Sequence, residues 1–140
     1  MKQLDDWREK LGFESRGYPP MRIVQKPWGH EEIWAETDSY VGKVLVINPG
    51  HRLSRQYHNL KEETFRVLFG VLTLEVGEGD DIVTHVLEAG QSFHCPPKTV
   101  HRMICLQALN YAPVNVLEVS TNHLDDVVRL EDDYKRTTDS

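Results

Sequence analysis

The pattern of apolar positions changes along the sequence. Between residues 21 and 120, β-type runs of about five to eight residues are separated by Gly, Pro, Asn and Asp, which is typical of antiparallel strands joined by turns. Glycines between apolar alternations in "LFGVL" and "VGEGDD" indicate hairpins, because glycine adopts positive φ without strain. We predict strands at Arg22–Lys26, Glu31–Ala35, Val41–Ile47, Leu53–His58, Glu63–Leu68, Val71–Val76, Ile82–Leu87, Ser92–Cys95, Thr99–Cys105 and Val114–Ser120.

Both ends of the sequence show a helical spacing instead. Leu4, Trp7 and Leu11 share one face at this spacing, which predicts a short helix within an extension at residues 1–20. Its apolar stripe would pack on the barrel or on a second subunit. Apolar residues between Leu124 and Tyr134 follow nearly the same period and predict a second helix. We therefore predict an all-β barrel at residues 21–140, a single domain that ends in a helix.

Composition narrows the class of protein. A length of 140 residues, with 39% hydrophobic and 27% charged residues, suits one domain with a sizeable core. The net charge of -6 argues against a general nucleic-acid surface but permits a local basic pocket for an anionic metabolite. No apolar signal core and no run long enough to cross a bilayer is found, so we expect a cytoplasmic protein. Cys95 and Cys105 lack a CxxC spacing, which favours buried reduced thiols over a disulfide.

Four side chains have the spacing of donors to a single metal ion. Gln56 and His58 are two residues apart on a predicted strand and therefore share a face. A turn at residues 59–61 returns Glu63 to them, and His101 follows "CPPKTV" at a later strand. An antiparallel barrel brings such strands together, and this nitrogen and oxygen set suits zinc, iron, manganese, cobalt or nickel. The alternative is that they are separate surface residues or hydrogen-bonded core residues.

The residues around these donors resemble the two cupin motifs. "PG", five residues, "QYH", four residues, "E", six residues and "G" is similar to the first motif. "G", five residues, "P", four residues and "H" is similar to the second. The stretches "QKPWGHEEIW", "GKVLVINPGHRLSRQYH", "VLEVS" and "DDVVRLEDDYKR" resemble the carboxy-terminal cupin domain of type II mannose-6-phosphate isomerases, including those fused to mannose-1-phosphate guanylyltransferase. The resemblance implies a jelly-roll barrel, the cupin-type double-stranded β-helix.

This resemblance also implies an activity. Gln56, His58, Glu63 and His101 would hold one divalent metal, with zinc favoured and glutamine at a place where many cupins have histidine. The chain would be a metal-dependent aldose–ketose isomerase that acts on a sugar or sugar phosphate through an enediol. A neutral amide donor leaves the metal more positive than a further carboxylate would, which favours Lewis-acid chemistry. A cupin that binds a sugar without turnover, or an iron cupin dioxygenase, is the alternative, since one barrel serves many reactions.

Basic side chains near the motifs are the candidates for substrate contact. Lys61 stands where phosphomannose isomerases have a basic residue near the metal, and it would stabilise the enediolate or orient the substrate. Arg52 and Arg102 are the first candidates for a phosphate group, and Lys61 and Arg102 are the candidate catalytic residues. Arg52 shares the inward parity of His58 if its strand begins that early, whereas Arg102 lies opposite His101 but near the rim. The alternatives are a solvated turn lysine and ordinary surface arginines.

The base for proton transfer stays open between Glu62, Glu75, Glu118 and a hydroxide on the metal, although Glu62 should point away from Glu63. An aromatic side chain, Trp28 or Trp34, would stack on a sugar ring or else belong to the core or an interface.

The sequence departs from the family at two places: "HNLKEE" replaces the usual histidine- and arginine-rich run, and "CPPKTVH" lacks the common glycine. Metal binding is therefore better supported than turnover of mannose-6-phosphate. We also expect a homodimer.

Overall fold

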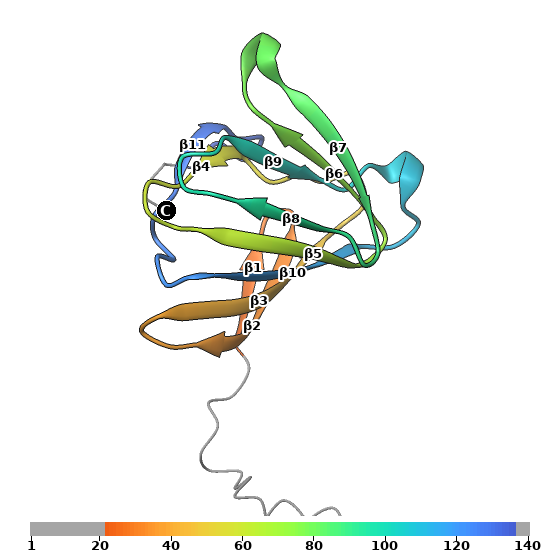
Figure 1. The fold of residues 1–140 in the computed structure, drawn as a ribbon. Helices are drawn as coiled ribbons and strands as arrows, with labels where there is room; N and C mark the ends of the chain where they lie inside the picture. Colours follow the sequence, from red (N-terminus) through yellow and green to blue (C-terminus); the bar gives the residue numbers. More distant parts are fainter. Residues whose placement is uncertain (1–21, 137–140) are drawn as a thin grey trace, which may run out of the picture.

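The computed structural model describes residues 22–136, and this part of the chain folds into β-strands with two short 3-10 turns and no α-helix. Two antiparallel sheets face each other (Figure 1). The six-stranded sheet has the order β1 (Arg22–Lys26), β2 (Gly29–Glu36), β3 (Tyr40–Ile47), β10 (Val114–Thr121), β5 (Glu63–Phe69) and β8 (Ser92–Cys95). The five-stranded sheet has the order β11 (Val128–Glu131), β4 (Arg55–Tyr57), β9 (His101–Ile104), β6 (Val71–Val76) and β7 (Val83–Glu88). The turns are η2 (Gly79–Asp81) and η3 (Gln107–Leu109).

Alternation of side chains builds the core between the sheets. Along β10, Val114 and Val116 are buried on the inner face, where Val116 pairs with Leu45 of β3 and Val67 of β5. Residues two apart on a strand share a face, so each strand contributes every second side chain to the interior. The core comprises Trp28, Leu45, Ile47, Phe65, Val67, Leu72, Leu74, Cys95, Met103, Cys105, Val114 and Val116. Cys95 and Cys105 are both buried and free, as predicted.

Strands that are distant in sequence become neighbours in this barrel. β10 lies between β3 and β5, and β4 pairs with β9. Gln56 and His101 are partners in the β4–β9 pair. Glu63 begins β5 in the opposite sheet and pairs with Cys95 of β8. The all-β barrel of two sheets that the sequence predicts is confirmed, and its topology brings segments 56–63 and 101–104 to one end of the interior.

The predicted helix between Leu124 and Tyr134 is wrong. This segment forms β11, which adds an edge strand beside β4, with Val128 opposite Tyr57 and Arg129 opposite Gln56. Two β-branched valines and an open strand edge favour sheet pairing, which overrides a weak helical period. The predicted amino-terminal helix lies outside the described residues. Among residues 22–136, no helix is long and apolar enough to cross a membrane.

The strand predicted at residues 53–58 is shorter than expected. Only Arg55–Tyr57 forms β4, while Arg52 makes a single bridge to Ile104. Ile104 and His101 are three residues apart on β9, and side chains at that distance on a strand point to opposite faces. Arg52 therefore lies on the face opposite to Gln56 and His101.

Candidate metal centre

Three of the predicted donors converge at one end of the barrel interior. His58 follows β4, Glu63 begins β5 and His101 begins β9, and one ligand atom from each lies within 4.8 Å of the others. Nε2 of His58 is 3.2 Å from Oε1 of Glu63, and Nε2 of His101 is 3.8 Å from the same oxygen. All three side chains are at least nine-tenths buried. Such burial of polar groups is costly unless each has a partner.

Hydrogen bonds to backbone carbonyls orient both imidazoles. Nδ1 of His58 donates to the carbonyl of Asp126, and Nδ1 of His101 donates to the carbonyl of Thr99 at 2.9 Å. In a neutral ring this leaves the Nε2 lone pair as the free acceptor, so both lone pairs are directed at the Glu63 carboxylate. Outer hydrogen bonds of this kind orient histidines that bind metals.

Two buried polar atoms in this group of residues lack a hydrogen-bond partner. Nε2 of His58 and Oε2 of Glu63 are buried and form no hydrogen bond. Two imidazole lone pairs beside a carboxylate repel one another, whereas a divalent cation between them would attract all three. The donor set of two nitrogens and one carboxylate matches the ligands of zinc and of similar transition metals. The residues present therefore fit a divalent metal.

Gln56, the fourth predicted donor, lies beside this group. It is the partner of His101 in the β4–β9 pair and lines the same cavity as His58. Its Oε1 accepts a hydrogen bond of 2.7 Å from the Ser54 hydroxyl. The amide therefore borders the centre, and its role as a fourth ligand stays a prediction.

A row of buried charges extends from Glu63 across the inner face of the six-stranded sheet. Nζ of Lys61 lies 3.9 Å from Glu63 and 3.2 Å from Glu118. Nζ of Lys43 lies 3.7 Å from Glu118 and 3.0 Å from Glu31. The carboxylates and ammonium groups alternate, so each interior charge of the row has an opposite charge on both sides. Such compensation allows five ionisable side chains to be buried together.

This row shifts two pKa values in opposite directions. Burial alone would lower the pKa of Lys61, but the carboxylates of Glu118 and Glu63 outweigh it and raise that pKa. Burial alone would raise the pKa of Glu63, but the positive charge of Lys61, together with the adjacent imidazoles of His58 and His101, lowers it to about 2. Lys61 is therefore a fixed cation and Glu63 a fixed anion near neutral pH. An anionic Glu63 is the form that binds metal.

A cavity of about 220 Å³ opens beside His58 and Gln56. The carboxylates of Glu31 and Asp125 line it. Its basic lining residues are more numerous, namely Arg22, Lys26, Lys43, Lys61, Arg129 and Arg136. In a protein of net charge -6 this is a concentration of positive charge. Burial lowers the pKa of Lys26, and the positive charges of Lys43, Arg136 and Arg129 lower it further although Glu31 raises it.

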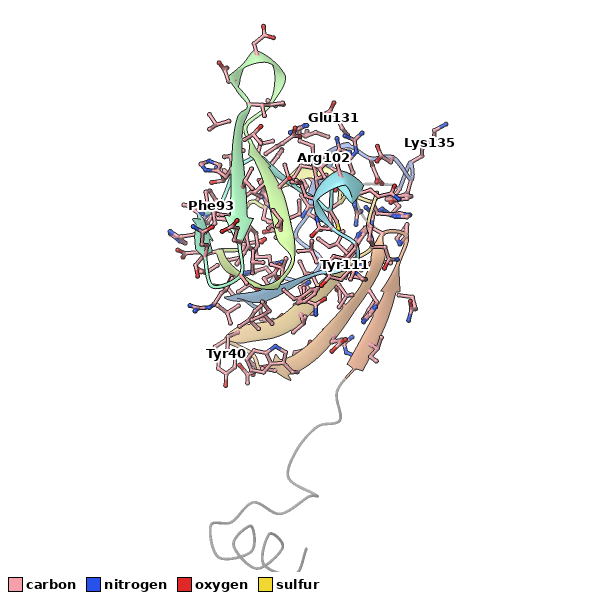
Figure 2. The ribbon with its side chains drawn as sticks, turned by 90° about the vertical axis from the view of Figure 1, so that its right-hand side faces the viewer. Tyr40, Phe93, Arg102, Tyr111, Glu131 and Lys135 are labelled. Carbon is pink, nitrogen blue, oxygen red and sulfur yellow. The ribbon has the colours of Figure 1, made fainter. Side chains whose placement is uncertain are left out.

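Arg52 and Arg102, the arginines predicted to contact substrate, do not line this cavity. Both pair with Asp133: Nε of Arg52 at 2.7 Å and NH2 of Arg102 at 3.4 Å. Nε of Arg102 also donates to the Leu53 carbonyl at 2.8 Å. Figure 2 shows Arg102 near the labelled Glu131 of β11 at the upper end of the barrel. Lys61 is the one residue of the predicted substrate set, Arg52, Lys61 and Arg102, that lines the cavity.

Two of the carboxylates considered as bases, Glu75 and Glu62, lie outside the cavity. Glu75 is bound to Arg55 at 2.7 Å, and neither residue lines the cavity. Glu62 is half exposed and pairs with His94 at 2.6 Å, so it points away from the centre as expected. Trp28 is buried and lines the cavity. Trp34 is half exposed and lies against Gly42, where an added Cβ would come within 2.6 Å of its ring.

Sequence reasoning missed several residues of the cavity. Glu31 and Lys26 flank "PWGH", and Arg129 and Arg136 belong to "DDVVRLEDDYKR". Reading the latter segment as a helix hid the alternation in its first half, since Val127 and Arg129 line the cavity two residues apart. A strand period at residues 127–131 was the signal that would have found Arg129.

Comparisons with known proteins agree with this architecture. A family model described as "Mannose-6-phosphate isomerase C-terminal" matches residues 17–132. The xanthan biosynthesis protein XanB of Xanthomonas campestris is 33% identical over 119 residues, which is 83% of this chain and 24% of that protein. The alginate biosynthesis protein AlgA of Pseudomonas aeruginosa is 31% identical over 119 residues, 83% of this chain and 23% of that protein. The chain spans about a quarter of the length of these curated relatives.

Solved structures share the fold at low identity. The capsular polysaccharide assembling protein CapF of Staphylococcus aureus matches with a TM-score of 0.69 at 17% identity, over 81% of this chain and 32% of that chain. KdgF of Halomonas matches with a TM-score of 0.61 at 16% identity, over 74% of this chain and 87% of that chain. Oxalate decarboxylase of Lactobacillus farciminis matches with a TM-score of 0.65 at 18% identity, over 79% of this chain and 33% of that chain. At these identities the likeness is one of fold.

Proposed function

The chain belongs to the mannose-6-phosphate isomerase C-terminal family, and on this premise we propose that it is a metal-dependent aldose–ketose isomerase of a sugar phosphate. The observation that carries the proposal is the convergence of Nε2 of His58, Nε2 of His101 and the Glu63 carboxylate at a cavity rich in basic side chains. A metal centre beside a basic cavity suits a substrate with both a carbonyl and an anionic group.

The metal would be held by His58, Glu63 and His101, with Gln56 as a fourth donor. A divalent metal bound there supplies Lewis-acid polarisation of the sugar carbonyl. Asp126 and Thr99 fix the two imidazoles through their carbonyls, so the donors are arranged before any ligand binds. A preference for zinc, a cytoplasmic location and a homodimeric state stay predictions from the sequence.

The isomerisation requires a base that removes a proton from the carbon next to the carbonyl and returns it to the former carbonyl carbon, while a proton passes from the hydroxyl oxygen to the carbonyl oxygen. Two carboxylates line the cavity, and we assign this role to Glu31 rather than to Asp125. Glu31 is buried and accepts a hydrogen bond of 3.0 Å from Nζ of Lys43, which holds it in place. Lys61, fixed between Glu118 and Glu63, would stabilise the negative charge that develops on the sugar oxygens.

The phosphate group would bind at the wall formed by Lys26, Arg129 and Arg136. Lys26 has no ion pair among the described residues, and the charges of both arginines act on its pKa. Arg136 is held by Asp132 through bonds of 2.9 and 3.2 Å, which presents its guanidinium in one orientation. Guanidinium and ammonium groups that are already positioned in a cavity are the usual ligands of a phosphate dianion.

The test is an exchange experiment on protein loaded with zinc, cobalt or manganese. Mannose-6-phosphate and fructose-6-phosphate are incubated in deuterium oxide and followed by proton NMR. Interconversion with loss of the proton at carbon 2, or deuterium entry at carbon 1 of the ketose, supports the isomerase. Unphosphorylated mannose should react far more slowly. Retention of metal and binding of the sugar phosphate without exchange would instead indicate a cupin that binds its ligand without turnover.

A further inference from the structure

The segment of residues 124–136, which comes after β10, lines part of the cavity and forms an edge of the five-stranded sheet, and we call it the strap. It contains β11, which pairs with β4 at Tyr57 and Gln56 (Figure 1). We infer that Asp126 of the strap is the residue that positions the ligand loop, residues 58–61, so that His58 and Lys61 reach the metal centre. The inference rests on the metal centre proposed above and assigns to it a residue that is not a ligand.

Asp126 contacts the ligand loop through both its backbone and its side chain. Its carbonyl accepts the hydrogen bond from Nδ1 of His58. Its carboxylate accepts three consecutive backbone N–H groups, from Asn59 at 3.1 Å, Leu60 at 2.7 Å and Lys61 at 3.0 Å. One side chain therefore fixes the backbone between the ligand His58 and the cation Lys61. A carboxylate that accepts several N–H groups forms charge-assisted bonds, which are stronger than neutral ones.

The tip of the loop, residues 59 and 60, has few other contacts. Asn59 and Leu60 are exposed, and Leu60 retains 65% of its surface, so the tip of the loop gains nothing from apolar burial. The two ends are held by other contacts: Lys98 N–H donates to the His58 carbonyl, the buried Lys61 side chain pairs with Glu118 and Glu63, and Thr121 N–H donates to the Glu62 carbonyl. Between these ends the path of the loop depends on Asp126.

The strap itself is anchored independently of the loop. Glu131 pairs with Arg55, and Asp133 pairs with Arg52 at 2.7 Å on the outer side of the sheet. Asp126 is therefore delivered to the loop by a segment that is already bound elsewhere. Loss of its carboxylate should free the loop tip without releasing the strap. Water can satisfy the N–H groups of the two exposed loop residues, so the free energy of unfolding should change little. The position of His58 should change, because the path of the loop is no longer fixed.

The experiment compares Asp126→Ala and Asp126→Asn with wild type. The control is Asp80→Ala in η2, which removes the same charge at the exposed tip of the β6–β7 hairpin. Dissociation constants for Zn²⁺ and Co²⁺ are measured by chelator competition. We expect a rise of about tenfold or more for Asp126→Ala, within the range typical of outer partners of metal ligands. A smaller rise is expected for Asp126→Asn and none for Asp80→Ala.

A second readout uses the metal-free proteins, whose folded state is checked by circular dichroism. In wild type the 15N spectrum should show His58 protonated at Nδ1, and in Asp126→Ala a mixture of both tautomers at the same pH. Unchanged metal affinity and an unchanged His58 tautomer in Asp126→Ala would overturn the inference while leaving the proposed function intact. If wild type itself binds no metal, the proposed function fails, and the tautomer measurement alone decides whether Asp126 positions the loop.

Discussion

Nε2 of His58 lies 3.2 Å from Oε1 of Glu63. Neither atom carries a proton, because the single proton of the neutral imidazole is on Nδ1, which donates it to the carbonyl of Asp126. Two acceptors that face each other in a buried site require a cation or a proton between them.

Glu63→Gln should weaken metal binding strongly. The substitution keeps the size of the side chain but removes the only carboxylate among the predicted ligands, so the dissociation constant for zinc should rise by at least about 100-fold, the upper range for outer partners. Metal content after dialysis and chelator competition provide the measurement. Glu62→Gln is the matched control, since that neighbour points outward to His94. Equal metal retention in the two variants would contradict the assignment.

Lys61→Met should destabilise the fold. Glu63 and Glu118 would each lose a buried cation within 4 Å, and breaking a buried pair by removing one partner costs about 3–5 kcal/mol. Urea unfolding of the metal-free protein measures the difference in the free energy of unfolding. Arg66→Met, on the exposed side of β5, should change it little. The double variant with Glu118→Gln should recover part of the loss, and failure to recover any would argue against the charge row.

Lys26→Met should raise KM for a sugar phosphate without changing metal affinity. The substitution removes one cation from the wall to which we assign the phosphate, and a loss of about 1.4 kcal/mol corresponds to a tenfold rise. Steady-state kinetics and inhibition by inorganic phosphate report it. Lys26→Arg keeps the charge and should retain most of the affinity. If KM is unchanged in Lys26→Met, the phosphate does not bind at this wall.

Acid should release the carboxyl end of the strap through Asp133. A hydrogen bond from Arg52, with the charges of Arg52 and Arg102, lowers the pKa of Asp133 although partial burial opposes this. A folded pKa below the unfolded value means that the stabilisation is fully present above the ordinary pKa of about 3.8 and disappears as pH falls through the folded pKa. Asp133→Asn should thus be less stable than wild type near neutral pH, by less than about 1 kcal/mol for a partly exposed pair. The difference should vanish in strong acid, as thermal unfolding across pH will show.

The strands and the grouping of two histidines with a glutamate could be predicted from the sequence for a physical reason. Alternation determines which face a side chain occupies, and turn residues mark where a strand ends, so the inward direction of His58, Glu63 and His101 could be predicted from local rules, while their convergence was predicted from an antiparallel barrel and from the cupin resemblance. The face on which Arg52 lies could not be predicted, because strand pairing is interrupted at residues 53–54 and the alternation counted from His58 does not extend to Arg52. The strap was misjudged because its partner, the free edge of β4, is a tertiary feature.

The position of β10 between β3 and β5 has a consequence for the order of events during synthesis. The ribosome delivers β3 and β5 long before Thr121, so each waits with an unpaired edge, and open edges invite association between chains. All predicted metal donors have emerged by residue 101, yet Asp126 has not. The loop that carries His58 should therefore be fixed only once the strap has been synthesised, and until Thr121 has been added, shielding of these waiting edges should limit association between chains.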